Sequence, residues 1–267
     1  MTDVSTFSTL EVHRDHGVMV VTLNRPEALN AITPLMCTEL VELIQEVHGD
    51  DSVRVVVITG RGRAFCAGGD VAEDVVPVSK MTPWEYRRNV ELYAAPMLGL
   101  VELDRPVIAA VNGVAVGGGW DLALACDIRI ASSKARFKDA YVQLAVLPEL
   151  GGTYFLPRLA GLGRAKLLSF TGDMISADEA LRYGLVEEVV DASMFDDYVM
   201  TLARRIAAGP AKAIAMTKLA MNRSLNFDLR GSMDYAKSLT PSLISSPDYR
   251  EAIAAFIEKR PANFEGA

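Results

Sequence analysis

Short runs rich in β-branched residues alternate with longer segments of helical period over most of the chain. The β-rich runs lie at residues 18–24, 53–60, 106–113, 127–132 and 185–190. Between them, residues 33–48 and 82–103 carry apolar side chains at the spacing of one helix face. This alternation is typical of α/β proteins, in which helices cover a mostly parallel sheet.

The β-rich pattern stops near residue 195. Residues 195–225 have helical character with a break at Gly209-Pro210, and a last helix is expected through residues 248–260. We therefore expect an α/β core over residues 1–194 and a helical C-terminal region over residues 195–267.

Composition narrows the classes of partner. The chain has 267 residues, of which 50% are hydrophobic, and a net charge of −7. The acidic balance and the lack of a basic run argue against nucleic acid and against an anionic membrane surface. The three cysteines, Cys37, Cys66 and Cys126, show no metal-binding or disulfide spacing. No apolar run approaches the ~18 residues of a membrane span, so we expect a cytoplasmic protein without a metal.

Three consecutive glycines, Gly117, Gly118 and Gly119, stand between a β-rich run and a helical segment. Each glycine costs a helix roughly 1 kcal/mol relative to alanine. A helix N-terminus presents unpaired N–H groups with partial positive charge, and bare backbone lets a negatively charged oxygen approach them. The alternative explanation is close packing of this backbone against a neighbouring strand.

A second glycine-rich turn, "GRGRAFCAGGD" at residues 60–70, also follows a β-rich run. Two such turns would supply the two N–H donors that an acyl or thioester oxyanion needs. Together they predict an oxyanion hole more specifically than either turn does alone.

These stretches carry a resemblance to a known family. "AFCAGGD" and "PVIAAVNGVAVGGGWDLALACDIRIAS" resemble motifs of the enoyl-CoA hydratase/isomerase (crotonase) superfamily, as do "LNRPEALNAI", "TGDMISADEALRYGLVEEVV" and "FIEKRPANF". The resemblance implies a spiral of ββα units with a helical C-terminal trimerisation region, in a homotrimer or homohexamer. It also implies an acyl-CoA thioester substrate and no separate cofactor, since coenzyme A is part of that substrate.

The resemblance assigns roles to individual residues. The N–H groups of Gly69 and Gly118 would form the oxyanion hole. Residues that would contact coenzyme A in the core are Ala28, Leu29, Ala67, Gly68, Asp70 and Val71. Phe256 and Lys259 of the last helix would contact the adenine and a phosphate, often across a subunit boundary. The alternative for this pair is a core aromatic residue and a solvated lysine.

The acid–base positions depart from the hydratase pattern. Family hydratases use two glutamates, and their positions here hold Asp121 and Tyr141. A phenol with a pKa near 10 cannot replace a glutamate in this role. Tyr141 is therefore expected to be a pocket wall, and Asp121 either structural or directed into the site.

Glu149 lies where several family isomerases carry their single acidic base. We expect it to shuttle a proton in an enoyl-CoA isomerisation, with its pKa raised by Leu144, Val146, Leu147 and Leu150. The alternatives are 2-enoyl-CoA hydration, a hydrolase or dehalogenase with Glu149 as nucleophile, a solvent-facing or helix-capping Glu149, and a non-catalytic binding protein. The acidic charge and both retained glycine turns count against the binding protein.

Overall fold

A six-stranded sheet in the order β1-β2-β3-β5-β7-β10 forms the centre of the computed structural model, which describes residues 7–266. Its strands are β1 (Leu10–Asp15), β2 (Val18–Leu23), β3 (Val55–Gly60), β5 (Val107–Val111), β7 (Ile128–Ser132) and β10 (Glu188–Val190). β1 is antiparallel to β2, and the other neighbours are parallel. The five β-rich runs of the sequence form the five neighbouring strands from β2 to β10. The expected α/β class is confirmed.

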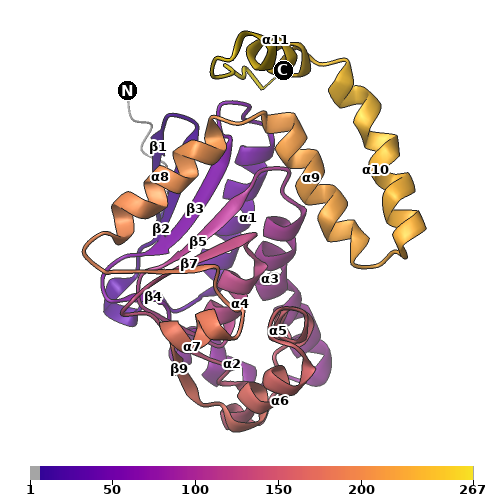
Figure 1. Cartoon of the computed structure of the whole chain (residues 1–267). Helices are drawn as coiled ribbons and strands as arrows, with labels where there is room; N and C mark the ends of the chain where they lie inside the picture. Colours follow the sequence, from indigo (N-terminus) through magenta and orange to yellow (C-terminus); the bar gives the residue numbers. More distant parts are fainter. Residues whose placement is uncertain (1–6, 267) are drawn as a thin grey trace.

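Alternate residues of the strands enter two separate cores. Val56 and Ile58 of β3 belong to the larger core, which is covered by α1 (Pro34–His48) and α3 (Pro83–Glu102). Val55 and Val57 face α8 (Phe195–Ala207) on the other side. Figure 1 shows α8 crossing one face of the sheet, with α1 and α3 behind it. The first helix of the C-terminal region thus packs on the core.

A second, four-stranded sheet positions the glycine turns. It contains β4 (Ala64–Cys66), β6 (Val114–Val116), β8 (Arg136–Lys138) and β9 (Met174–Ser176), in that order. β4 and β6 are parallel, so the segments that follow them leave from the same end of the sheet. The π-helix η2 (Val71–Val75) follows β4, and α4 (Gly118–Ala125) follows β6. The predicted helix start at Gly118 is confirmed.

Further helices surround this centre and extend from it. They are η1 (Pro26–Ala28), α2 (Val76–Val78), η3 (Tyr141–Leu144), α5 (Gly152–Ala160), α6 (Leu162–Thr171), α7 (Ala177–Arg182), α9 (Ala211–Ser224), α10 (Leu229–Ile244) and α11 (Pro247–Glu258). Figure 1 shows α10 and α11 reaching away from the sheets. In residues 7–266, no helix is both long enough and apolar enough to cross a membrane.

Candidate functional site

The two glycine turns lie against each other. A methyl group built on Gly68 would come within 2.8 Å of the carbonyl oxygen of Val116 and 3.7 Å of the backbone nitrogen of Gly118. The turn after β4 is held by Ile32, whose N–H donates to the Gly68 carbonyl at 2.8 Å and whose carbonyl accepts from the Asp70 N–H at 2.9 Å. Gly69 lies between these two hydrogen bonds.

The surroundings of the three consecutive glycines differ, so the reason for having glycine differs from one position to the next. Gly117 adopts a φ of +51°, which side chains rarely tolerate. A methyl on Gly119 would lie 2.2 Å from the carbonyl oxygen of Cys66, so this glycine allows α4 to pack on β4. A methyl on Gly118 would instead face the Cδ1 atoms of Ile32 and Leu150, each at 3.3 Å. Close packing therefore explains Gly119, whereas Gly118 faces other side chains.

The backbone donors of Gly69 and Gly118 are unpaired within residues 7–266. Neither N–H donates a hydrogen bond to a backbone or side-chain acceptor of these residues. Gly118 is the first residue of α4, where the helix dipole places partial positive charge. Two adjacent donors without acceptors provide a place for a negatively charged oxygen.

The core residues predicted to contact coenzyme A lie beside these donors. The Ala67 N–H donates to the Leu29 carbonyl at 3.1 Å, which joins the loop after η1 to the turn after β4. Asp70 accepts from Arg25 Nη1 at 3.0 Å and from the Ala72 N–H at 2.9 Å, and so caps η2. The structure therefore brings together residues 28–29 and 67–71.

The C-terminal pair lies elsewhere in the chain. Phe256 belongs to α11, and Lys259 caps that helix with a φ of +54°. Figure 1 shows α11 at one end of the molecule, far from α4 and from α2, the helix that follows η2. The Phe256 side chain is 83% exposed, so the core-aromatic alternative is wrong for this residue.

Asp121 is buried behind Tyr141. The Tyr141 hydroxyl donates to Asp121 Oδ2 at 2.5 Å, and Asp121 is only 1% exposed. Burial raises the pKa of Asp121 to about 7, against the opposing effect of the Tyr141 hydrogen bond. The Tyr141 hydroxyl in turn lies 3.9 Å from a methyl built on Gly118. Tyr141 thus stands between the unpaired donor and the buried acid.

Glu149 lies in the loop before α5, and its carboxylate accepts a hydrogen bond from the Tyr86 hydroxyl of α3. The expected apolar enclosure is wrong for three of its four residues, because Leu144, Val146 and Leu147 are between 46% and 60% exposed. They lie on a surface segment, and only Leu150 turns inward, towards Gly118.

Two polar groups of the site were missed by sequence reasoning. A methyl built on Gly69 would lie 2.3 Å from Oδ2 of Asp74, which belongs to η2. Tyr86 belongs to the same face of α3 as Asn89 and Tyr93, three and seven residues further along. This spacing was the available signal, but only the fold shows that this face borders the second glycine turn.

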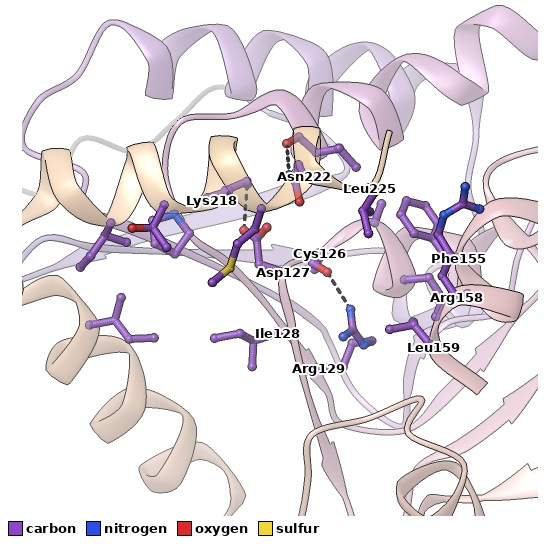
Figure 2. Close-up of a pocket in the computed structure, with 18 of the residues that line it drawn as sticks. Cys126, Asp127, Ile128, Arg129, Phe155, Arg158, Leu159, Lys218, Asn222 and Leu225 are labelled. Carbon is purple, nitrogen blue, oxygen red and sulfur yellow. Dashed lines mark hydrogen bonds and ion pairs between the residues drawn. The ribbon is translucent and has the colours of Figure 1, made fainter. Parts of the chain in front are cut away.

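A separate cavity of about 790 Å³ lies between α9 and the start of β7, and its lining includes neither glycine turn. Figure 2 shows Lys218 directed at Asp127, and Lys218 Nζ lies 2.8 Å from Asp127 Oδ2. Lys218 also donates to the carbonyls of Leu100 and Arg105, and Arg129 pairs with Glu187. These charges are satisfied within the chain, so the glycine turns remain the candidate active site.

Comparisons with known proteins identify the family of the chain. Residues 13–267 match the family model described as enoyl-CoA hydratase/isomerase. The chain is 39% identical to a 1,2-epoxyphenylacetyl-CoA isomerase of Escherichia coli K12, over 95% of this chain and 97% of that protein. It is 40% identical to a short-chain-enoyl-CoA hydratase of Clostridium acetobutylicum, over 93% and 94%. The crystal structure of an enoyl-CoA hydratase from Bacillus anthracis superposes with a TM-score of 0.92 at 36% identity, covering 97% of this chain and 100% of that one.

Proposed function

The chain belongs to the enoyl-CoA hydratase/isomerase family, and we propose that it shifts a carbon–carbon double bond within an enoyl-CoA thioester, with Glu149 as the base. In this proposal the thioester oxygen accepts hydrogen bonds from the N–H groups of Gly69 and Gly118. Removing one such donor typically costs 10²- to 10³-fold in rate. The reaction needs no cofactor beyond the coenzyme A that the substrate carries.

The observation that carries this proposal is the position of Tyr141, whose hydroxyl lies near Gly118 and donates to the buried Asp121. The two hydratase positions hold a buried aspartate and the tyrosine in front of it, so they offer no carboxylate that a substrate can reach. Glu149 is exposed, and its charge contributes to the raised pKa values of Asp121 and Tyr141, mainly caused by burial. Of the residues at the family's acid–base positions, Glu149 is therefore the accessible carboxylate.

The proposed chemistry follows from these positions. Glu149 removes a proton from C2 of a 3-enoyl thioester, and the electron pair spreads into a dienolate whose oxygen is held by the two donors. Protonation at C4 then gives the 2-enoyl thioester. Relatives are named both isomerase and hydratase, so 2-enoyl-CoA hydration is the second candidate.

The C-terminal helices support a proposed homotrimer or homohexamer. α9 and α10 contain no buried residue, and α11 exposes Phe256 and Ile257 by 83% and 72%. Helices with apolar side chains in solvent gain most of their stability when those side chains are covered. In such an assembly Phe256 and Lys259 would reach coenzyme A bound to a second copy of the chain.

An activity panel with two variants tests the proposed function. The panel contains 2-enoyl, 3-enoyl and 3,5-dienoyl-CoA esters. Glu149→Gln should keep the fold and the affinity for coenzyme A esters, yet lose roughly 10²- to 10⁴-fold of 3-enoyl to 2-enoyl isomerisation, because an amide cannot accept the proton.

Asp121→Asn is the matched comparison and should lower isomerisation less. A larger loss in Asp121→Asn, together with faster hydration than isomerisation by the unmodified protein, would replace the isomerase proposal with the hydratase. Unchanged turnover of every ester in both variants would refute a catalytic role for the site.

A further inference from the structure

A third carboxylate lies beside the second glycine turn. Asp74 is in η2, four residues after the residue that caps this helix. A methyl built on Gly69 would lie 2.3 Å from its Oδ2 and 3.4 Å from its Cγ, so the carboxylate occupies the space next to the proposed oxyanion donor. Asp74 is half-buried, whereas its neighbour Glu73 faces solvent and lies 3.3 Å from Arg25 Nη2.

The face of α3 opposite Asp74 contains a buried hydroxyl close to the Asp74 carboxylate. Asn89 and Tyr93 lie beside the Asp74 carboxylate. Tyr93 is 4% exposed, and its hydroxyl makes no hydrogen bond of ordinary geometry with any of residues 7–266. The Asp74 carboxylate is the acceptor beside this hydroxyl, and burial together with the charge of Asp74 raises the pKa of Tyr93.

Tyr86 interacts with both Asp74 and the proposed base, Glu149. Its hydroxyl donates to Glu149, and its own pKa is raised by burial, by Glu149 and by the charge of Asp74. The charge of Glu149 also acts on Asp74. Two carboxyl groups from different elements are therefore close enough to act on each other, and Asp74 is the one that borders Gly69.

We propose that Asp74 is a second acid–base residue of this site and supplies a proton while Glu149 removes one. This inference rests on the proposed function. A charged carboxylate beside Gly69 would oppose the negative oxygen of the dienolate, so Asp74 has to be neutral when that oxygen forms.

The surroundings of Asp74 favour that neutral form. Burial raises its pKa above the ordinary value, and the charges of Asp70 and Glu149 add to this effect, while Tyr93 and Asn89 act in the opposite direction. A carboxylic acid kept neutral beside a developing oxyanion can donate a proton or a hydrogen bond.

The proton balance is complete with these two groups. Glu149 takes the proton from C2, and the C–H electron pair forms the dienolate. Asp74 gives its proton to C4, where the double-bond electrons form the new C–H bond. Glu149 then releases its proton to solvent, to which it is exposed, and Asp74 takes one from solvent.

An isotope experiment distinguishes proton transfer by Glu149 and Asp74 together from proton transfer by Glu149 alone. The substrate is 3-enoyl-CoA carrying deuterium at both C2 positions, turned over in ordinary water. With Asp74 as the donor, the hydrogen added at C4 comes from solvent. In Asp74→Asn we expect kcat to fall roughly 10²-fold, and any deuterium that appears at C4 of its product marks turnover in which Glu149 alone moves it.

Glu73→Gln is the control, since it removes the same charge from the same short helix on its solvent side. It should match the unmodified protein in rate and label position. Melting temperature and coenzyme A ester affinity of Asp74→Asn check that its fold is intact. Deuterium at C4 in the unmodified protein, or an Asp74→Asn variant unchanged in rate and label, overturns the role of Asp74.

The activities of the two variants distinguish a failure of the role of Asp74 from a failure of the proposed function. If Glu149→Gln is inactive while Asp74→Asn behaves as the unmodified protein, the role of Asp74 is refuted and the proposed function stands. If the unmodified protein does not turn over the ester, both are refuted.

Discussion

Asp121 and Glu149 are both acids near the glycine turns, yet their surroundings differ in almost every respect. Asp121 is 1% exposed and lies behind Tyr141, whereas Glu149 lies on a surface loop and is held by Tyr86. Burial raises the pKa of Asp121 to about 7, compared with 3.8 for the free side chain. Asp121 therefore affects folding stability directly, and Glu149 is the residue available for substrate.

The raised pKa of Asp121 predicts a pH dependence of stability. The folded state binds this proton more tightly than the unfolded chain, so stability falls as pH rises from about 4 through the folded pKa. Asp121→Asn has no proton to lose. Between pH 5 and pH 8 its free energy of unfolding should rise by about 3 kcal/mol relative to the unmodified protein. Urea unfolding at both pH values measures this, and a constant difference contradicts it.

Individual site residues were predictable where the backbone itself makes the site. Glycine turns after two strands predict a pair of backbone donors, and the family resemblance assigns them to Gly69 and Gly118. In the structure the two turns lie against each other, and both donors are unpaired within residues 7–266. The surroundings of Glu149 were not predictable, because neighbours in sequence such as Leu147 point to solvent. Its partner Tyr86 lies 63 residues away, on a helix whose docking only the fold determines.

At the scale of elements, the contact of β4 with α4 decides how close the two turns come. The Gly119 backbone packs on the Cys66 carbonyl, while Gly118 faces the space bordered by Ile32 and Leu150. Neighbouring glycines in one helix therefore have different tasks, one in packing and one in the site.

Two alanine substitutions test this division. Gly119→Ala places a methyl 2.2 Å from backbone that cannot move aside, and should cost at least about 3 kcal/mol of stability. Gly118→Ala meets only side-chain ends at 3.3 Å, so its stability should change by no more than about 1 kcal/mol. Its methyl narrows the proposed carbonyl site, so turnover should fall by about 10²-fold. Thermal melts and turnover measurements of both variants test these assignments. Equal stability losses would contradict the separate roles of Gly119 in packing and Gly118 in the site.

For the molecule as a whole, the long helices were predictable and the strands of the second sheet were not. The expected helices at 33–48 and 82–103 correspond to α1 and α3, each capped by the threonine that precedes it. The strands of the second sheet have only three residues each, too few to show a two-residue period. α10 lies within the helical region expected over residues 195–267, but its bounds were not predicted, because Gly231 and Pro241 interrupt its helical pattern.

The location of the C-terminal helices connects the chain's shape to its proposed assembly. α11 lies far from the glycine turns of its own chain, as Figure 1 shows. In the proposed oligomer each site would combine the turns of one copy with the last helix of another.

A crystal structure with a non-hydrolysable acyl-CoA analogue shows whether the two glycine turns hold the thioester oxygen of an acyl-CoA. We predict the carbonyl oxygen of the analogue about 3 Å from the backbone nitrogens of both Gly69 and Gly118, with Glu149 and Asp74 facing its acyl chain. A complex in which that oxygen lies elsewhere, for example in the cavity beside Lys218, would contradict the account.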